Sequence, residues 1–85
     1  MKVTYTTYAK PRCPVDHKLD NYEVTIISDR VIMAEILNET LKEWATKEAF
    51  QEDFTVELAR EFGCYVRTVG THSGVRTVAE AGGHA

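Results

Sequence analysis

Alternating apolar and polar side chains near both ends of the chain predict β-strands. Residues 2–9, KVTYTTYA, alternate with a period of two, and their β-branched and aromatic content favours an extended backbone. The same pattern recurs in three further segments: residues 22–26, 64–69 and 75–79. A turn at residues 72–74, HSG, separates the last two segments. The pattern therefore predicts four strands, two before and two after the middle of the chain.

In the middle of the chain the period becomes that of a helix. From Val31 onward a broad apolar stripe is formed by Ile32, Met33, Ile36, Leu37, Leu41, Trp44 and Ala45. Ser28 or Asp29 is expected to cap the start of this helix. A second helix is predicted over residues 48–62, with an apolar stripe at Phe50, Phe54, Leu58 and Phe62. Gly63 follows, where a left-handed residue commonly ends a helix.

The order of elements is therefore β-β-α-α-β-β, in a single domain of residues 1–85. This order predicts an α+β fold in which a four-stranded antiparallel sheet carries two helices on one face. The opposite face and both outer edges of such a sheet remain uncovered, and an exposed edge pairs readily with another chain. We therefore expect a homo-oligomer that closes into a barrel by edge-to-edge pairing, with active sites between subunits.

Composition narrows the range of functions. The chain has 10 basic and 13 acidic residues, a net charge of -3, which argues against a broad non-specific phosphate-binding surface. No apolar run approaches the roughly 18 residues of a membrane span, and no basic and apolar leader precedes the cysteines. We therefore expect a cytoplasmic chain with reduced thiols and no membrane partner.

Cys13 is the first candidate for chemistry. It lies between two prolines in a stiffened loop over residues 10–20, and Asp20 follows seven residues later, close enough to exchange a proton. Three nearby basic side chains favour the thiolate, which is the reactive form of cysteine: Arg12, His17 and Lys18. The residues alone also fit a structural interpretation, in which Cys13 packs at the end of a strand and Asp20 is a turn residue.

The cysteines and histidines also suggest a metal site, because both are common zinc ligands. Cys13 and His17 share a loop, whereas Cys64 and His72 bracket a strand that would span about 20 Å. All four side chains would not easily meet, and we therefore expect no metal site.

The segment FQED, residues 50–53, is the second candidate. Carboxylates suit the first turn of a helix, and Asp53 is interpreted in that way. Glu52 has a further use, because a carboxylate can accept two parallel N–H bonds from the amide and amino edge of a guanine-like ring. Phe50 could supply a stacking surface for such a ring.

Together these segments resemble the QueF-type nitrile enzymes of the tunnelling-fold superfamily. CPVDHKLD, residues 13–20, resembles their signature of Cys-Pro, five residues and Asp, and FQED resembles their Phe-His-Glu-Asp segment. The resemblance covers nearly the whole chain and implies that Cys13 attacks a nitrile, that Asp20 handles protons and that Glu52 holds a purine-like base. Gln51, beside Glu52, replaces the family's histidine. The β-β-α-α-β-β order is also that of the tunnelling fold.

One motif separates the two activities of this family. Its NADPH-dependent reductases carry a Glu-Ser-Lys-Ser-x-Lys-like segment for the cofactor, where residues 35–40 read EILNET. Both lysines are missing, although a multiply anionic cofactor needs positive charge. The short archaeosine-synthase type also lacks this motif, and the chain is most similar to it in its shortness, its NYEVTI strand and its closing VAEAGG.

The resemblance to that type implies an amidinotransferase. Such an enzyme converts the nitrile of 7-cyano-7-deazaguanine in tRNA or DNA into the formamidine of archaeosine, with ammonia as co-substrate and no redox cofactor. Cys13 would form a covalent thioimide while Asp20 protonates the nitrile nitrogen, and ammonia would then release the product. Two alternatives stay open: an NADPH-dependent nitrile reductase with a divergent cofactor site, and a non-catalytic protein that binds deazaguanine.

Overall fold

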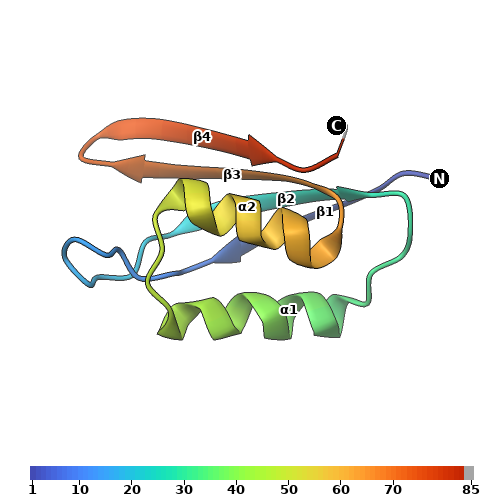
Figure 1. Ribbon diagram of the computed structural model, residues 1–85, viewed down its shortest axis with the longest axis horizontal. Coiled ribbons are helices and arrows are strands. Elements are labelled where there is room, and N and C mark those ends of the chain that lie inside the picture. Colours follow the sequence, from blue (N-terminus) through green and yellow to red (C-terminus); the bar gives the residue numbers. More distant parts are fainter. Residues whose placement is uncertain (84–85) are drawn as a thin grey trace.

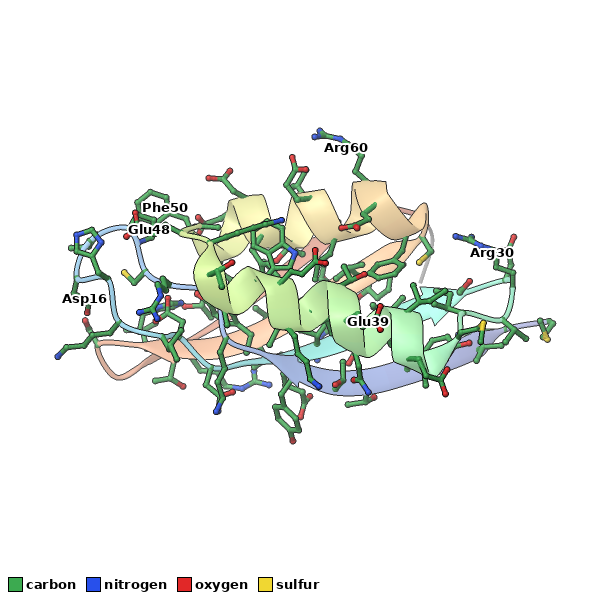
Figure 2. All side chains as sticks on the ribbon, turned by 90° about the horizontal axis from the view of Figure 1, so that it is seen from below. Asp16, Arg30, Glu39, Glu48, Phe50 and Arg60 are labelled. Atoms are coloured by element: carbon green, nitrogen blue, oxygen red, sulfur yellow. The ribbon has the colours of Figure 1, made fainter. Side chains whose placement is uncertain are left out.

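The computed structural model describes residues 1–83 and contains one four-stranded antiparallel sheet in the order β1-β2-β3-β4 (Figure 1). The elements are β1 (Val3–Ala9), β2 (Tyr22–Ser28), α1 (Ala34–Glu43), the short 3-10 helix η1 (Trp44–Thr46), α2 (Gln51–Phe62), β3 (Tyr65–His72) and β4 (Val75–Ala81). Both helices cover the same face of the sheet (Figure 2). The predicted α+β architecture and its β-β-α-α-β-β order are confirmed.

Alternation along β2 builds the core. Tyr22, Val24 and Ile26 are buried on the face that carries the helices, whereas the residues between them are only partly buried. In the register of the sheet, Val24 lies opposite Thr68 and Ile26 lies opposite Val66, so the two central strands present one continuous face. Because side chains alternate across a strand, this register fixes which residues face α2.

The first helix begins later than predicted. Neither Ser28 nor Asp29 caps it; α1 starts at Ala34 after Met33, and that end has no side-chain cap. The Ser28 hydroxyl instead accepts a hydrogen bond of 3.1 Å from the backbone N–H of Arg30 and stabilises the turn after β2. The predicted stripe was therefore too broad: Leu37, Leu41 and Trp44 are buried, but Ile36 lies on the outer side and is 52% exposed.

The second helix follows its prediction closely. Phe54, Leu58 and Phe62 are buried, and Gly63 ends the helix with a left-handed φ of 64° and an N–H that donates to the carbonyl of Ala59. The helix starts at Gln51 rather than at residue 48, because Phe50 has an extended backbone just before it. Phe50 consequently lies outside the core and is 50% exposed.

The hairpin between β3 and β4 is a tight two-residue turn. Ser73 and Gly74 both have positive φ, 51° and 81°, as a type I′ turn requires. Within residues 1–83, β4 pairs only with β3 and β1 only with β2, so both outer edges are free of a partner strand. The expected barrel of several copies remains a prediction. In the same residues, no helix is long and apolar enough to cross a membrane.

Three connections meet at one end of the sheet, opposite the two termini (Figure 1). They are the loop between β1 and β2, the segment that leads into α2, and the β3–β4 turn. Each of these connections carries residues that the sequence singled out. The fold therefore gathers them at a single end of the molecule.

Candidate functional site

A cleft of about 670 Å³ opens where these three connections meet. Its wall includes all five residues that we expected to act on a substrate: Cys13, Asp20, Phe50, Gln51 and Glu52. Segments far apart in the sequence thus contribute to one cavity, although the roles of these residues remain predictions.

The loop that carries Cys13 is folded back on itself by backbone hydrogen bonds. Cys13 donates to the carbonyl of Lys18 at 2.8 Å and accepts from the N–H of His17 at 2.9 Å, while Asp20 donates to the carbonyl of Pro11 at 2.9 Å. His17 has a positive φ of 61° and turns the chain. Cys13 and Asp20 therefore lie on the two arms of one small hairpin.

Arg12 ties this hairpin to the segment before α2. Its N–H donates to the carbonyl of Lys47 at 2.9 Å, and its carbonyl accepts from the N–H of Ala49 at 3.0 Å. The loop that carries Cys13 and the segment before α2 are thus joined through the backbone of a single residue. This connection fixes Cys13 relative to Glu52 in a way that the sequence did not reveal.

The surroundings of the Cys13 sulfur differ from those expected. The Arg12 guanidinium donates to the carbonyl of His17, and the His17 ring contacts the carboxylate of Glu48, so these two basic groups are bound elsewhere. Lys18 does line the cleft. The backbone N–H of Val15 approaches the Cys13 sulfur at 3.4 Å and can stabilise a thiolate.

Asp16 lies on this loop, at the end of the molecule (Figure 2), and its side chain contacts that of Cys13. Its carboxylate accepts a hydrogen bond of 3.0 Å from the backbone N–H of Lys18. This bond is the main reason that the pKa of Asp16 is lowered, and a hydrogen bond from the Cys13 side chain lowers it further. The loop thus places a carboxylate next to the Cys13 thiol.

Tyr22 and His72 both lie next to the Asp20 carboxylate. The Tyr22 hydroxyl donates to the Asp20 carboxylate at 3.2 Å, and the Nδ1 atom of His72 lies 4.0 Å from the other carboxylate oxygen. Burial, and then the negative charge of Asp20, raise the pKa of Tyr22. The phenol therefore stays protonated and remains a hydrogen-bond donor to Asp20.

Gln51 is buried and forms part of the wall behind Asp20. Its amide nitrogen donates to the carbonyl of Thr77 at 3.0 Å and to the carbonyl and hydroxyl of Thr68, both at 3.2 Å. Its amide oxygen lies 3.1 Å from the Nε2 atom of His72. Gln51 also lines the cleft beside Glu52, so its expected place next to a base remains a prediction; the contacts add that it holds the His72 ring.

Glu52 and Phe50 also line the cleft. Glu52 stands in the first turn of α2, where its charge suits the positive end of the helix, and it is exposed to the cleft. Phe50 presents a half-exposed ring at the same rim (Figure 2). An exposed carboxylate beside an exposed aromatic ring can bind a flat heterocycle by its edge and its face.

Cys64 is remote from this chemistry. It is 8% exposed within the apolar core, and burial raises the pKa of its thiol. Both cysteines are free. In the part of the chain that the structure describes, no three cysteine, histidine or acidic side chains cluster as metal ligands would. His84, which we interpreted as part of the tail, lies outside the described residues.

Two residues of the site were missed by the sequence reasoning. Tyr22 was read only as an apolar position of a strand, and His72 only as a turn residue or metal ligand. Only the pairing of β2 with β3 brings them together. Tyr22 begins β2 and His72 ends β3, so both lie on the helix face of the sheet at the cleft end. No local motif marks such a pair.

Comparisons with known proteins bear on the fold. No protein-family model and no curated protein sequence matches the chain. A solved structure described as the crystal structure of the archaeosine synthase QueF-Like in the apo form is similar, with a TM-score of 0.83 and 22% sequence identity. The similarity covers 99% of this chain and 96% of that one. It confirms the predicted tunnelling fold and, at this identity, shows the fold alone.

Proposed function

We propose that this protein is an amidinotransferase of the archaeosine-synthase type. Its substrate would be 7-cyano-7-deazaguanine within a nucleic acid, whose nitrile it converts to a formamidine with ammonia. The observation that carries the proposal is that Cys13 and Asp20, held on one hydrogen-bonded hairpin, line the same cleft as Glu52. The fold shared with the archaeosine synthase QueF-Like structure supports it.

The first half-reaction would form a thioimide. The Cys13 sulfur attacks the nitrile carbon, and its proton passes through Asp20 to the nitrile nitrogen. Ammonia then adds to the same carbon and expels the sulfur, which leaves the formamidine. Neither step changes the oxidation level of the carbon, so the reaction requires ammonia as co-substrate but no redox cofactor and no metal.

Glu52 and Phe50 would hold the base. Glu52 accepts the amide and amino N–H groups of the deazaguanine edge, while the half-exposed ring of Phe50 stacks on its face. A nitrile at the far side of the ring then points toward Cys13. A base within tRNA or DNA would have to leave its stack to enter this cleft.

The residues of α1 argue against the reductase alternative. The two lysines of the reductases' cofactor motif fall at Leu37 and Thr40, and Leu37 is buried in the core. Neither of these side chains carries the positive charge that would bind the phosphates of a nicotinamide cofactor. The same cleft residues are therefore better suited to ammonia than to hydride chemistry.

The free edges of β1 and β4 support an assembly of identical subunits. Each edge presents unpaired backbone groups that a second copy can satisfy. We propose a ring closed by such pairing, with neighbouring subunits completing the cleft. Size-exclusion chromatography with light scattering would give the mass; a monomer at micromolar concentration would contradict the ring.

Mass spectrometry of the intact protein tests the chemistry directly. After incubation with 7-cyano-7-deazaguanine, we expect a mass gain equal to the intact base, which ammonium then discharges as the amidine. The Cys13→Ala protein should show no gain, whereas the matched Cys64→Ala protein should behave as wild type. The same experiment with tRNA and DNA that carry the base identifies the form of the substrate; absence of an adduct with all three would contradict the proposal.

A further inference from the structure

Four polar side chains form one connected cluster behind the nucleophile. Tyr22 joins Asp20 to His72, because its hydroxyl lies 3.2 Å from the Asp20 carboxylate and 3.1 Å from the Nε2 atom of His72. Gln51 closes the cluster through its amide oxygen, 3.1 Å from the same nitrogen. The His72 ring thus lies between the buried Gln51 amide and Asp20, the expected proton donor of the reaction.

The orientation of Gln51 determines where the His72 ring carries its proton. The amide nitrogen of Gln51 faces the backbone carbonyls of Thr68 and Thr77, which only accept hydrogen bonds. Its oxygen must therefore face His72, and this oxygen also only accepts. The Nε2 atom of His72 consequently carries a hydrogen, and in the neutral ring the lone pair is on Nδ1.

The Nδ1 atom lies near Asp20. It is 4.0 Å from a carboxylate oxygen, so the two groups must approach by about 1 Å to share a hydrogen bond. The Tyr22 ring fixes the arrangement from the side, since it stacks on Phe54 and packs against His72 with ring centres 5.6 Å apart. The geometry suits the exchange of one proton between the carboxyl and Nδ1.

We propose that His72 is a positioning residue that shares a proton with Asp20, an inference that rests on the proposed function. When the sulfur–carbon bond forms, the thiol proton of Cys13 passes to the Asp20–His72 pair and from Asp20 to the nitrile nitrogen. In the second half-reaction the pair takes a proton from ammonium, ammonia adds to the thioimide carbon, and the carbon–sulfur bond breaks. The product leaves as the amidinium ion, and the retained proton returns to the Cys13 thiolate.

The first test needs no substrate. In protein labelled with ¹⁵N at histidine, long-range ¹H–¹⁵N spectra identify which ring nitrogen carries the hydrogen in neutral His72. We expect hydrogen on Nε2 in wild type, and loss of this fixed tautomer in Gln51→Leu. A neutral ring with its hydrogen on Nδ1 in wild type would overturn the inference, whether or not the protein forms an adduct.

The second test measures the rate of adduct formation at saturating base, followed by mass. We expect His72→Phe to be slower by about 10²-fold, the lower end for loss of a proton-transfer group, with little change in the affinity for the base. His72→Gly should be slow as well and partly rescued by added imidazole. Unchanged rates in both variants, or a loss confined to affinity, would overturn the inference.

The two proposals fail in different ways. A wild-type protein that forms no adduct contradicts the proposed function, while the spectra still decide the place of the proton on His72. A wild-type adduct whose rate is insensitive to His72 supports the function and contradicts the inference. Thermal unfolding of each variant, compared with wild type, excludes loss of the fold as the cause of a lower rate.

Discussion

The two ends of the layer between the sheet and α2 are built from different kinds of side chain. Near the termini, Ile26, Leu58 and Val66 are completely buried and apolar. At the cleft end, the buried residues of α2 and β3 are instead polar: Gln51 on α2 and Thr68 on β3. Every buried side-chain nitrogen and oxygen within residues 1–83 has a hydrogen-bond partner.

This difference indicates how the small domain divides its tasks. Apolar burial contributes roughly 25 cal/mol per Å² of surface removed from water, whereas a buried hydrogen bond adds only about 1 kcal/mol net. The apolar end therefore supplies most of the stability. The polar end gives up some packing energy and in return holds Asp20 and His72 in fixed positions.

The two cysteines offer the sharpest test of this division, since one lies at each end. Cys13→Ala should abolish adduct formation and turnover with little change in the melting temperature. Cys64→Ala should keep activity and lower stability by about 1 to 2 kcal/mol, because it leaves a small cavity in the core. Intact mass and thermal unfolding measure both; equal loss of activity in the two variants would contradict the division.

Asp20→Asn should give the next largest effect. The amide keeps the size of the side chain and can still accept from Tyr22, so we expect the fold to persist. Adduct formation should slow by about 10² to 10⁴-fold, as for a removed general acid. Asp53→Asn, which changes an exposed carboxylate in the first turn of α2, is the matched control and should keep the wild-type rate.

Glu52→Gln tests the expected binding of the base in the cleft. Replacing the carboxylate removes a charged acceptor, and hydrogen bonds to charged groups contribute about 1.5 to 3 kcal/mol. We therefore expect the affinity for the free base to fall by about 10- to 100-fold, measured by calorimetry with the Cys13→Ala protein. If the Cys13→Ala protein bound the base equally well with and without Glu52→Gln, the assignment of Glu52 to the edge of the base would be wrong.

Gly70→Ala should disturb the polar end alone. A Cβ atom at residue 70 would lie 2.5 Å from carbons of the Tyr22 ring, so this ring must shift. We expect a loss of about 1 to 3 kcal/mol from overpacking, together with slower adduct formation as Asp20 loses its support. Gly83→Ala, with no neighbour within 4 Å of the added atom, should leave stability and rate unchanged.

The smallest expected effect is on stability at alkaline pH. The pKa of Tyr22 is raised in the folded state by burial and by Asp20, from an ordinary value of 10.0. The neutral phenol therefore contributes stability that is complete below about pH 10 and is lost as pH rises above it. Urea unfolding should show that the free energy of unfolding decreases less between pH 8 and pH 11 for Tyr22→Phe than for wild type. An identical decrease would show that ionisation of Tyr22 is not the cause.

Much of the fold could be predicted from the sequence, because its elements are locally encoded. The period of two in β2, the spacing of Phe54, Leu58 and Phe62, and the glycine that ends α2 each act within a few residues. The start of α1 was predicted too early, because Ser28 is a good capping residue by type but is used in a turn instead. Local preference cannot show which of two hydrogen-bonding roles a serine takes.

The candidate site was predictable only where a resemblance supplied a motif. The segments around Cys13 and Glu52 could be recognised, and the structure places both in one cleft. Tyr22 and His72, fifty residues apart, meet only through the register of β2 and β3. The contacts of Gln51 likewise depend on carbonyl groups of β3 and β4, which no side-chain pattern reveals.

The backbone connection at Arg12 has a consequence for the dynamics of the site. Its two hydrogen bonds, to Lys47 and Ala49, can open only when the loop that carries Cys13 and the segment before α2 separate. Amide hydrogen exchange at Arg12 and Ala49 should then proceed with a common opening rate, slower than that of the exposed tip of the loop. Local opening would disconnect Cys13 from Glu52 in one cooperative event, so that each molecule holds either a complete site or none.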